Sequence, residues 1–464
     1  MAYKRGEEVF RDPKPFIYFV DPKYRKVVCD WGLKMCENEG ILKACIKCKW
    51  VHYCDQTCQK EAWNSHHKLE CKYLQKQSMT ENLKEIFSGD CGDYWQDHFL
   101  KLLKTTLKLN NNGTEEVFQL PNGKKRRFAD LVSNSEERRK QLEQKNMFGN
   151  ILSMYEEFRI WLEDIMLPSF IEFFEIFGKW QTNAISMMAM DFDKPCINIA
   201  GGLYLGYSSL DHSCVPNALW FNIGKAVVVR IIEDVENFSA IRVSYFEACE
   251  KTHERREYLR ENYFFNCTCL KCENPDSDAK FSSLKCKSCP GWVHEITRIC
   301  IGCNQSLKLN DEELTLVEKY KKGTLPKCDP TMTTKEIRSM LEKYMKIFHV
   351  FHEIYRSFEK VLSFPKIVSQ KRSGNHDALL LVLEIRKLKL NHYSGHLPRF
   401  HHDIVTYAFH TSYAYVALKL FDEAEFHMKK AEEVMKITYG EDHPYMQEHQ
   451  KQKMKFQFAR IALK

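Results

Sequence analysis

The sequence predicts an α+β protein in which a β-rich domain with three zinc-binding clusters precedes an all-helical C-terminal domain. Three observations carry this prediction. Of the nineteen cysteines, seven fall in 29–71, three in 267–272 and four in 286–303. In Ala-Ile-Arg-Val-Ser-Tyr (240–245), apolar and polar residues alternate as in a half-buried strand. From about Thr331 the chain has no cysteine, few glycines and apolar residues at helical spacing.

Length and composition indicate a globular chain of two to four domains. It has 464 residues, 44% of them apolar and 28% charged, with a formal net charge of +7. This mildly basic balance gives only weak support for acidic or nucleic-acid partners. The most apolar stretch, 160–177, carries four acids and a proline, and therefore predicts a helix pair. We see no signal peptide or membrane span in the sequence, and we expect a protein of the cytoplasm and nucleus.

The first cysteine cluster has the ligand types and spacings of a zinc finger. Reducing compartments disfavour disulfides, and closely spaced cysteine pairs supply the soft ligands of tetrahedral zinc. Here Cys45-x2-Cys48 and Cys54-x3-Cys58 are such pairs, while a histidine and Cys71 share one helix face. Two histidines, His66 and His67, compete for that position. With Cys29 and Cys36 the segment offers eight ligands, enough for two ions.

Two further clusters complete the expected metal sites. Cys267-x-Cys269-x2-Cys272 provides three ligands, and Cys214 is the candidate for the fourth, which would clamp two distant pieces of chain together. Cys286-x2-Cys289-x10-Cys300-x2-Cys303 has the pattern of a zinc ribbon, with a structural role because four thiolates leave no open position. We therefore expect about four zinc ions per chain.

These motifs together resemble one known family. The order of ligands in 29–71 resembles the MYND finger, whose interleaved pairs imply Cys29, Cys36, Cys54 and Cys58 on one ion and Cys45, Cys48, His67 and Cys71 on the other. The segment 210–272, with Leu-Asp-His-Ser-Cys-Val-Pro-Asn and Cys-x-Cys-x2-Cys, resembles the end of a SET domain and its post-SET segment. A MYND finger before such a segment is similar to the SMYD family of protein-lysine methyltransferases, which use S-adenosyl-L-methionine.

The resemblance implies a domain order along the chain. It would begin with residual SET strands (1–28), with 6–20 as the strand before the finger, and continue with the MYND finger (29–71). A helical insert (72–180), the SET core (181–248), the post-SET zinc segment (249–275) and the zinc ribbon (284–304) would follow. The last part (310–464) would be tetratricopeptide-like, with 407–446 as helices that end at Gly440 and Pro444.

The resemblance also implies the roles of individual residues. Tyr245 and Tyr263 would be catalytic. The Tyr245 hydroxyl would orient the methyl group and the amine, and Tyr263 together with Phe265 would wall the lysine channel. The residues expected to contact the cofactor are Asn134, Asn183, Ser208, Asp211, His212, Tyr245 and Phe265. From strand pattern alone, Tyr245 would be read as an ordinary core tyrosine, and isolated asparagines are usually turn or cap residues. An apolar aromatic channel would favour the neutral lysine that methyl transfer needs.

Two departures from the family pattern leave a second function open. The family's Gly-x-Gly stretch has no counterpart in Met-Ala-Tyr-Lys-Arg before Gly6, and Asp211 stands where the family has asparagine. We therefore expect a divergent or N-terminally shortened member that binds S-adenosyl-L-methionine more weakly. The alternative is a weak or inactive protein acting as an interaction scaffold or transcriptional regulator.

The expected partners follow from the same resemblance. They are a histone or non-histone protein bearing the target lysine and, at the finger, proline-containing peptides. The basic run 123–128 is more typical of a solvated loop than of a nucleic-acid site, so we expect nucleic-acid binding to be weak or absent. We expect no membrane partner, and we expect the protein to be a monomer.

Overall fold

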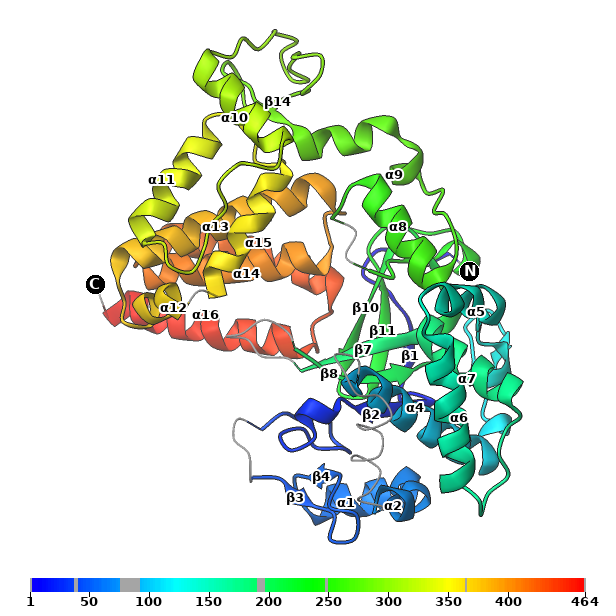
Figure 1. The fold of residues 1–464 in the computed structure, drawn as a ribbon. Coiled ribbons are helices and arrows are strands. Elements are labelled where there is room, and N and C mark those ends of the chain that lie inside the picture. Colours follow the sequence, from blue (N-terminus) through cyan, green and yellow to red (C-terminus); the bar gives the residue numbers. More distant parts are fainter. Residues whose placement is uncertain are drawn as a thin grey trace.

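The structure is a computed structural model that describes residues 2–36, 41–75, 92–189, 197–246, 249–363 and 365–462. Small β-sheets occupy the middle of the molecule (Figure 1). The finger, defined as residues 29–71, lies at one end of these sheets. Helices α4–α7 flank the sheets on one side, and helices α10–α16 form a separate body on the other side.

Two antiparallel three-stranded sheets form the β-rich centre. One has the order β1-β11-β10 and the other the order β2-β8-β7. Their strands are β1 (Glu8–Asp12), β10 (Ala218–Ile223), β11 (Ala226–Ile231), β2 (Ile17–Val20), β8 (Ile197–Leu203) and β7 (Ala184–Ala189). The sequence treats 6–20 as one strand, and that prediction is wrong. Pro13 and Pro15 lack the N–H groups that a continuous ladder needs, and the two halves join different sheets.

A short parallel pair beside these sheets places the predicted site. Strand β9 (Asp211–His212) pairs with β12 (Arg242–Val243), so that Asp211 lies opposite Arg242 and His212 opposite Val243. The continuous strand expected over 241–245 is not formed, because the pairing ends at Val243. The N–H group of Tyr245 donates instead to the imidazole Nδ1 of His212, at 3.1 Å. Tyr245 therefore lies just beyond the strand.

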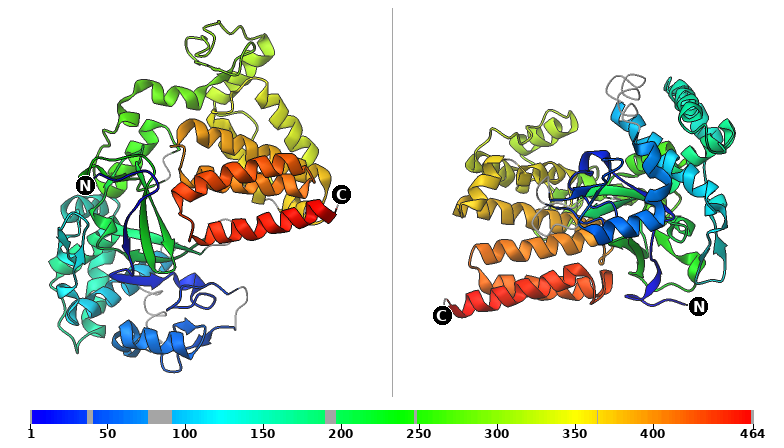
Figure 2. Two further views of the ribbon diagram at one scale, coloured as in Figure 1. Left: turned by 180° about the vertical axis from the view of Figure 1, so that it is seen from behind. Right: turned by 90° about the horizontal axis from the view of Figure 1, so that it is seen from below.

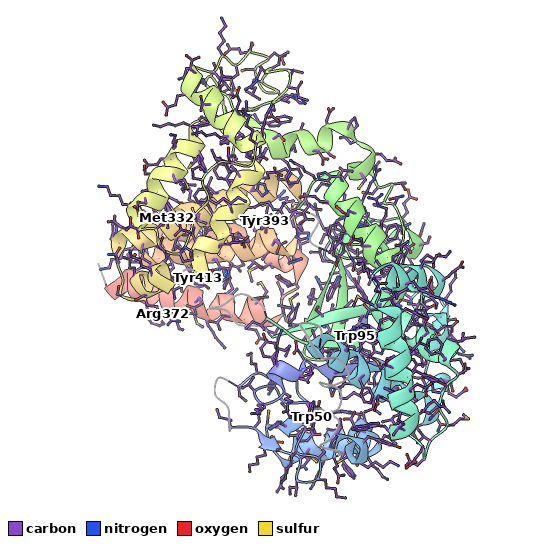
Figure 3. All side chains as sticks on the ribbon, in the orientation of Figure 1. Trp50, Trp95, Met332, Arg372, Tyr393 and Tyr413 are labelled. Atoms are coloured by element: carbon purple, nitrogen blue, oxygen red, sulfur yellow. The ribbon has the colours of Figure 1, made fainter. Side chains whose placement is uncertain are left out.

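The four helices that flank the sheets on the side away from the C-terminal helical body share an aromatic core. The rings of Phe99, Phe158 and Phe173 contact one another with centroids 4.6 and 5.0 Å apart. Trp95, 1% exposed, lies on the first of these helices (Figure 3). The stretch 160–177, expected to form a helix pair, contains only the end of one helix and the first half of the next, with a non-helical segment over 162–169 between them. The helices are α4 (Gly92–Asn110), α5 (Ser135–Gln144), α6 (Phe148–Trp161) and α7 (Phe170–Asn183), and a small hairpin of β5 (Phe118–Gln119) and β6 (Lys125–Arg126) interrupts the otherwise helical segment.

The cysteine-rich segments contain short elements. The finger includes Trp50 (Figure 3), whose ring lies 4.1 Å from the Arg25 guanidinium. It is built from β3 (Lys43–Ala44), β4 (His52–Tyr53), α1 (Gln56–Ala62) and α2 (Lys68–Leu74). Farther along the chain come α8 (Thr252–Tyr263), α9 (Leu270–Glu273), β13 (Leu284–Lys285) and β14 (Trp292–Val293).

The C-terminal body is helical, as the sequence predicts, and its last helices stack side by side (Figure 2). The helices are α10 (Asp311–Lys321), α11 (Thr334–Met345), α12 (Pro365–Arg372), α13 (His376–His396), α14 (His402–Ala417), α15 (Phe421–Thr438) and α16 (Pro444–Ala462). The helical end predicted at Gly440 and Pro444 is confirmed at the glycine, since α15 ends at Thr438 and Gly440 has φ 85°. Pro444 itself starts α16, as a first-turn proline can. Among the described residues, none of these helices has the length and apolarity to cross a membrane.

Candidate functional site

The finger brings one complete set of four zinc-type ligands together. Cys45, Cys48, His67 and Cys71 are all buried, and their ligand atoms lie within 4.8 Å of one another. The Sγ atoms of Cys45 and Cys71 are 3.9 Å apart, and His67 Nε2 lies 3.3 Å from Cys45 Sγ. Zinc–sulfur bonds of about 2.3 Å place the sulfurs of a tetrahedron about 3.8 Å apart. The donor set and its spacing therefore fit zinc.

His67, rather than His66, belongs to this group. The Nδ1 atom of His67 lies 3.1 Å from Glu70 Oε1, which leaves Nε2 facing the sulfurs. A carboxylate on the second ring nitrogen is the usual way in which a zinc-binding histidine is oriented. His66 instead places its Nε2 atom 3.2 Å from Asp30 Oδ2 and stacks on Trp31.

The other finger group lies at the start of the segment. The ligand atoms of Cys29, Cys54 and Cys58 are gathered within 4.8 Å. Cys36 ends a small bridged loop in which Val28 pairs with Met35, and its N–H donates to the carbonyl of Val27. Burial and the neighbouring cysteines, Cys36 among them, raise the pKa of the Cys54 thiol. The structure therefore gathers three of the four predicted ligands, and Cys36 is not part of this group of three.

The third group joins segments that are far apart in sequence. Cys214 Sγ lies 3.9 Å from Cys267 Sγ and 3.6 Å from Cys272 Sγ, and Cys269 completes the group, which we call the Cys214 cluster. These spacings also match a tetrahedral zinc centre. The buried guanidinium of Arg255 donates to Cys272 Sγ at 3.5 Å. A cation beside the sulfurs favours the thiolate form that binds metal.

The fourth group forms the ribbon, defined here as residues 284–308. Cys286 and Cys303 have their sulfurs 3.7 Å apart, and those of Cys289 and Cys300 are 3.5 Å apart. The N–H groups of Gly291 and Gly302 donate to Cys289 and Cys300, as in zinc knuckles. His294 is turned to its own loop, where its Nδ1 accepts from the N–H of Ile296.

The aromatic residues predicted for the catalytic site lie directly beside the Cys214 cluster. The rings of Tyr245 and Tyr263 are 4.8 Å apart, and His212 lies 5.2 Å from Tyr245 and 6.1 Å from Phe265. The Tyr245 hydroxyl donates to the carbonyl of Leu210 at 2.7 Å. Burial, with a smaller contribution from the Asp211 charge, raises the pKa of Tyr245 to about 12. Burial and the nearby Asp211 charge therefore keep the Tyr245 phenol protonated.

His212 links the metal group to Tyr245. Its Nδ1 accepts the N–H of Tyr245, so its Nε2 carries the proton, and this atom lies 3.3 Å from Cys214 Sγ. Burial lowers the pKa of His212 to about 4 and keeps the ring neutral. A neutral imidazole can accept on one nitrogen while it donates on the other. One residue therefore transmits the position of the Cys214 cluster to the backbone of Tyr245.

The two predicted asparagines lie together at the junction of α5 and α7. Asn134 has a left-handed backbone with φ 49°, and its amide donates to the hydroxyl of Thr182 at 3.3 Å. The neighbouring Asn183 uses its amide nitrogen to donate to the carbonyls of Val132 and Lys179. Both side chains use the amide nitrogen in these bonds, which fix the orientation of the two amide groups.

Two arginines that sequence reasoning missed tie these parts into one region. Arg138 donates to Thr182 and to the carbonyl of Asn262, and its guanidinium lies 5.0 Å from the Phe264 ring. It thereby joins the asparagine pair to the Tyr263–Phe265 segment. Arg126 donates to the backbone carbonyl and the hydroxyl of Ser208. Its position in a basic run hid this role, because the run looks like a solvated loop.

Asp211 differs from the other predicted cofactor residues in its exposure. Its side chain is 77% exposed and lies 3.9 Å from the Arg242 guanidinium. The contact is a long surface ion pair, which contributes little to stability. Asp211 therefore lies at the rim of the aromatic group rather than within it.

Comparison with known proteins places these features in a class of zinc-finger proteins. The MYND finger family model matches residues 29–71. The chain is 30% identical to human "Histone-lysine N-methyltransferase SMYD3" over 282 residues, which cover 59% of this chain and 58% of that relative. It is 26% identical to Arabidopsis thaliana "Histone-lysine N-methyltransferase ASHR1" over 475 residues, which cover 96% of this chain and 89% of the relative. It is 22% identical to mouse "N-lysine methyltransferase SMYD2" over 413 residues, which cover 89% and 85% of the two chains.

The family model shows a MYND finger at residues 29–71, and the relatives matched include proteins named SMYD2 and SMYD3. The chain is therefore similar to SMYD proteins, both in its finger and beyond it. Its match to the SMYD3 relatives spans less than two thirds of their length, at 58%.

Proposed function

We propose that this protein is an S-adenosyl-L-methionine-dependent protein-lysine methyltransferase, in which the β-rich centre is a SET domain and the helical body is tetratricopeptide-like. The observation that carries the proposal is the half-buried group of Tyr245, Tyr263, Phe265 and His212, held against the Cys214 cluster. The names of the relatives agree with this reaction class.

The chain's own residues suit a reaction that needs an uncharged amine. The Tyr245 and Tyr263 rings pack on each other with their centroids 4.8 Å apart, and burial raises the pKa of both phenols, so neither carries a charge at neutral pH. A lysine that lies beside this aromatic pair loses hydration, which lowers its pKa and favours the neutral nucleophile. The Leu210 carbonyl fixes the hydroxyl of Tyr245. These contacts hold the ring before the substrate arrives, and such preorganisation is a recognised source of rate enhancement.

The aromatic and polar side chains around Tyr245 fit the chemistry of S-adenosyl-L-methionine. S-adenosyl-L-methionine supplies a methyl group on a cationic sulfur, together with an adenosine and an amino acid group. Aromatic ring faces such as those of Tyr245 and Phe265 attract cations. The residues that would hold the remaining parts are Asn134, Asn183, Ser208 and His212, with Arg126 and Arg138 fixing two of the segments that carry them.

The test compares two tyrosines that make the same kind of bond in different parts of the molecule. Tyr245 donates to the Leu210 carbonyl at 2.7 Å, and Tyr355 in the helical body donates to the Phe348 carbonyl at 2.9 Å. Loss of either hydroxyl should cost about 1 kcal/mol of stability. We expect Tyr245→Phe to lower the rate of lysine methylation on a histone and protein-extract panel by about a hundredfold, as for other preorganised groups. Tyr355→Phe should leave it unchanged.

Cofactor binding separates the possible outcomes. Calorimetric titration with S-adenosyl-L-methionine should give similar affinity for the wild-type chain and Tyr245→Phe, since the lost hydroxyl acts on the amine. Equal methylation rates for the two variants would remove Tyr245 from the reaction. If the wild-type chain neither binds the cofactor nor methylates protein, the scaffold function is the correct one.

A further inference from the structure

The ribbon presents an apolar outer face that nothing in the proposed function uses. Backbone bonds pair β13 with β14 and β14 with residues 299–301, so that side chains alternate between two faces. Leu284, Val293 and Cys300 point inward and are fully buried, at 0% exposed. Lys285, Trp292, Ile299 and Ile301 occupy the opposite side, and with Ile296 at the adjoining turn they form what we call the ribbon face.

The exposure of this face is unusually high for branched apolar residues. Ile296 is 83% exposed, Ile301 57% and Ile299 44%. The three lie within six residues of sequence, on one small unit that projects beside α10 at the edge of the molecule (Figure 1). Single exposed isoleucines are ordinary, whereas a group on one face is typical of an interaction site.

The ribbon is firmly attached, so its face is presented in a fixed orientation. Leu284 forms a β-bridge with Phe348, Lys285 N–H donates to the carbonyl of Ile347, and His349 N–H donates to the carbonyl of Ser283. The inner residues pack into the hydrophobic core of the helical body together with Leu316 and Val317 of α10. A preformed surface of this kind loses little entropy when a partner binds.

The charges around the ribbon face indicate the chemistry of the partner. The ribbon carries Lys285, Lys287, Arg298 and Lys308 against a single acid, Glu295. Glu295 is already paired with Lys321 at 3.1 Å. Lys287 is likewise paired with Glu313, at 2.8 Å. Arg298 Nη1 is buried and has no hydrogen-bond partner among the described residues, so it adds positive charge below the surface rather than a contact at it. The ribbon therefore carries a net positive charge beside the exposed isoleucines.

We propose that the ribbon face is a docking site for a protein segment that carries carboxylates beside aliphatic side chains. The aliphatic groups would cover the three isoleucines and the edge of Trp292, and the carboxylates would meet the exposed Lys285 and Lys308. Nucleic acid fits less well, because phosphates gain nothing from isoleucine and base stacking needs more aromatic rings than Trp292 alone. The partner also differs in charge from a lysine-rich methylation substrate.

A synthetic amphipathic helix of about 20 residues, built from leucine and glutamate, is the probe. Its fluorescence anisotropy is measured with the full zinc-loaded chain. We expect saturable binding that weakens at least about tenfold in Ile299→Ser/Ile301→Ser. Lys285→Gln/Lys308→Gln should weaken binding less and reduce its salt dependence. The matched control is Phe458→Ser/Ile461→Ser on α16, where both side chains are at least 70% exposed, and it should bind like the wild-type chain.

The outcomes that would overturn the proposal are specific. They are no binding of the probe, equal loss in the ribbon and α16 variants, or preference for the same helix with lysine in place of glutamate. Preferential binding of a DNA duplex would point to nucleic acid instead. A dimer in sedimentation would instead make a second copy of this chain the occupant of the ribbon face. The second copy could bind through the exposed Ile160, Met166 and Ile171 near the α6–α7 turn. Zinc content and circular dichroism establish that each variant is folded.

Discussion

The ribbon and the Cys214 cluster each have four cysteine ligands, but these ligands are separated by very different lengths of sequence. The ribbon takes all four cysteines from 286–303, and its inner face packs on α10. The Cys214 cluster joins Cys214 to 267–272, and Tyr245 and Phe265 lie against it through His212. A local metal site organises its own short segment. A long-range one also fixes whatever lies between its ligands, here the aromatic group of the proposed active site.

The largest expected effect comes from removing one ligand of each cluster. Cys214→Ala and Cys289→Ala should each lower the zinc content by one ion from the predicted four, as counted by native mass spectrometry. Only Cys214→Ala should also release His212 and increase hydrogen exchange over 263–265. Losing this support should reduce methylation by about a hundredfold or more.

The comparison fails if the two variants behave alike. Unchanged zinc content in Cys214→Ala would show that the cysteines form no metal site there. Equal losses of activity would show that the ribbon supports the active site as strongly as the Cys214 cluster does. A wild-type count of two ions or fewer would remove at least two of the four assignments.

The same contrast explains what could be predicted from sequence. The finger and ribbon ligands are visible because their spacings are local and chemically specific, and Cys214 could be added because three clustered cysteines leave one vacancy. The junction of Arg138 with Thr182 and Asn262 could not be found in this way, because it depends on how α5, α7 and α8 meet. The alternation of apolar residues over 241–245 predicts a strand through Tyr245. It cannot report that the pairing ends at Val243 and that the N–H of Tyr245 donates to the His212 imidazole instead of to a strand.

The second prediction concerns how the finger and the ribbon are attached. Lys104 of α4 is 7% exposed and lies 3.2 Å from Glu70 and 4.0 Å from Asp30, two almost fully buried acids of the finger. Lys104→Met would leave these carboxylates without their cation, and removing one partner of a buried pair costs about 3–5 kcal/mol. The ribbon's Lys287–Glu313 pair is half exposed on the lysine side, so Lys287→Met should cost at most about 1 kcal/mol.

Urea unfolding followed by tryptophan fluorescence measures this difference. Glu70→Gln/Lys104→Met is the informative double variant, because it should recover part of the loss by removing one uncompensated charge. Equal destabilisation by Lys104→Met and Lys287→Met would mean that the finger is attached no more tightly than the ribbon.

The smallest expected effect is a pH dependence of stability that arises within the β-rich centre. Asp12 on β1 is 4% exposed, and its carboxylate accepts the N–H of Gly206, directly before Tyr207 and Ser208. Burial raises the pKa of Asp12 from 3.8 to about 6, although the bond from Gly206 opposes the shift. Because the folded pKa lies above the unfolded one, the stability contributed by this group is present below pH 4 and is lost as pH rises through 6.

Asp12→Asn should remove this dependence while keeping an oxygen that accepts from Gly206. We expect the free energy of unfolding of the variant, relative to wild type, to rise by about 2–3 kcal/mol between pH 4 and pH 8. Urea titrations at matched ionic strength would measure it. A constant difference across this range would show that Asp12 titrates normally, and a decrease would show that ionised Asp12 is stabilised by its neighbours. Asp12 is bonded to Gly206, in the segment that leads to Ser208. A rise in stability with unchanged methylation would therefore show that Asp12 supports this segment without taking part in the reaction.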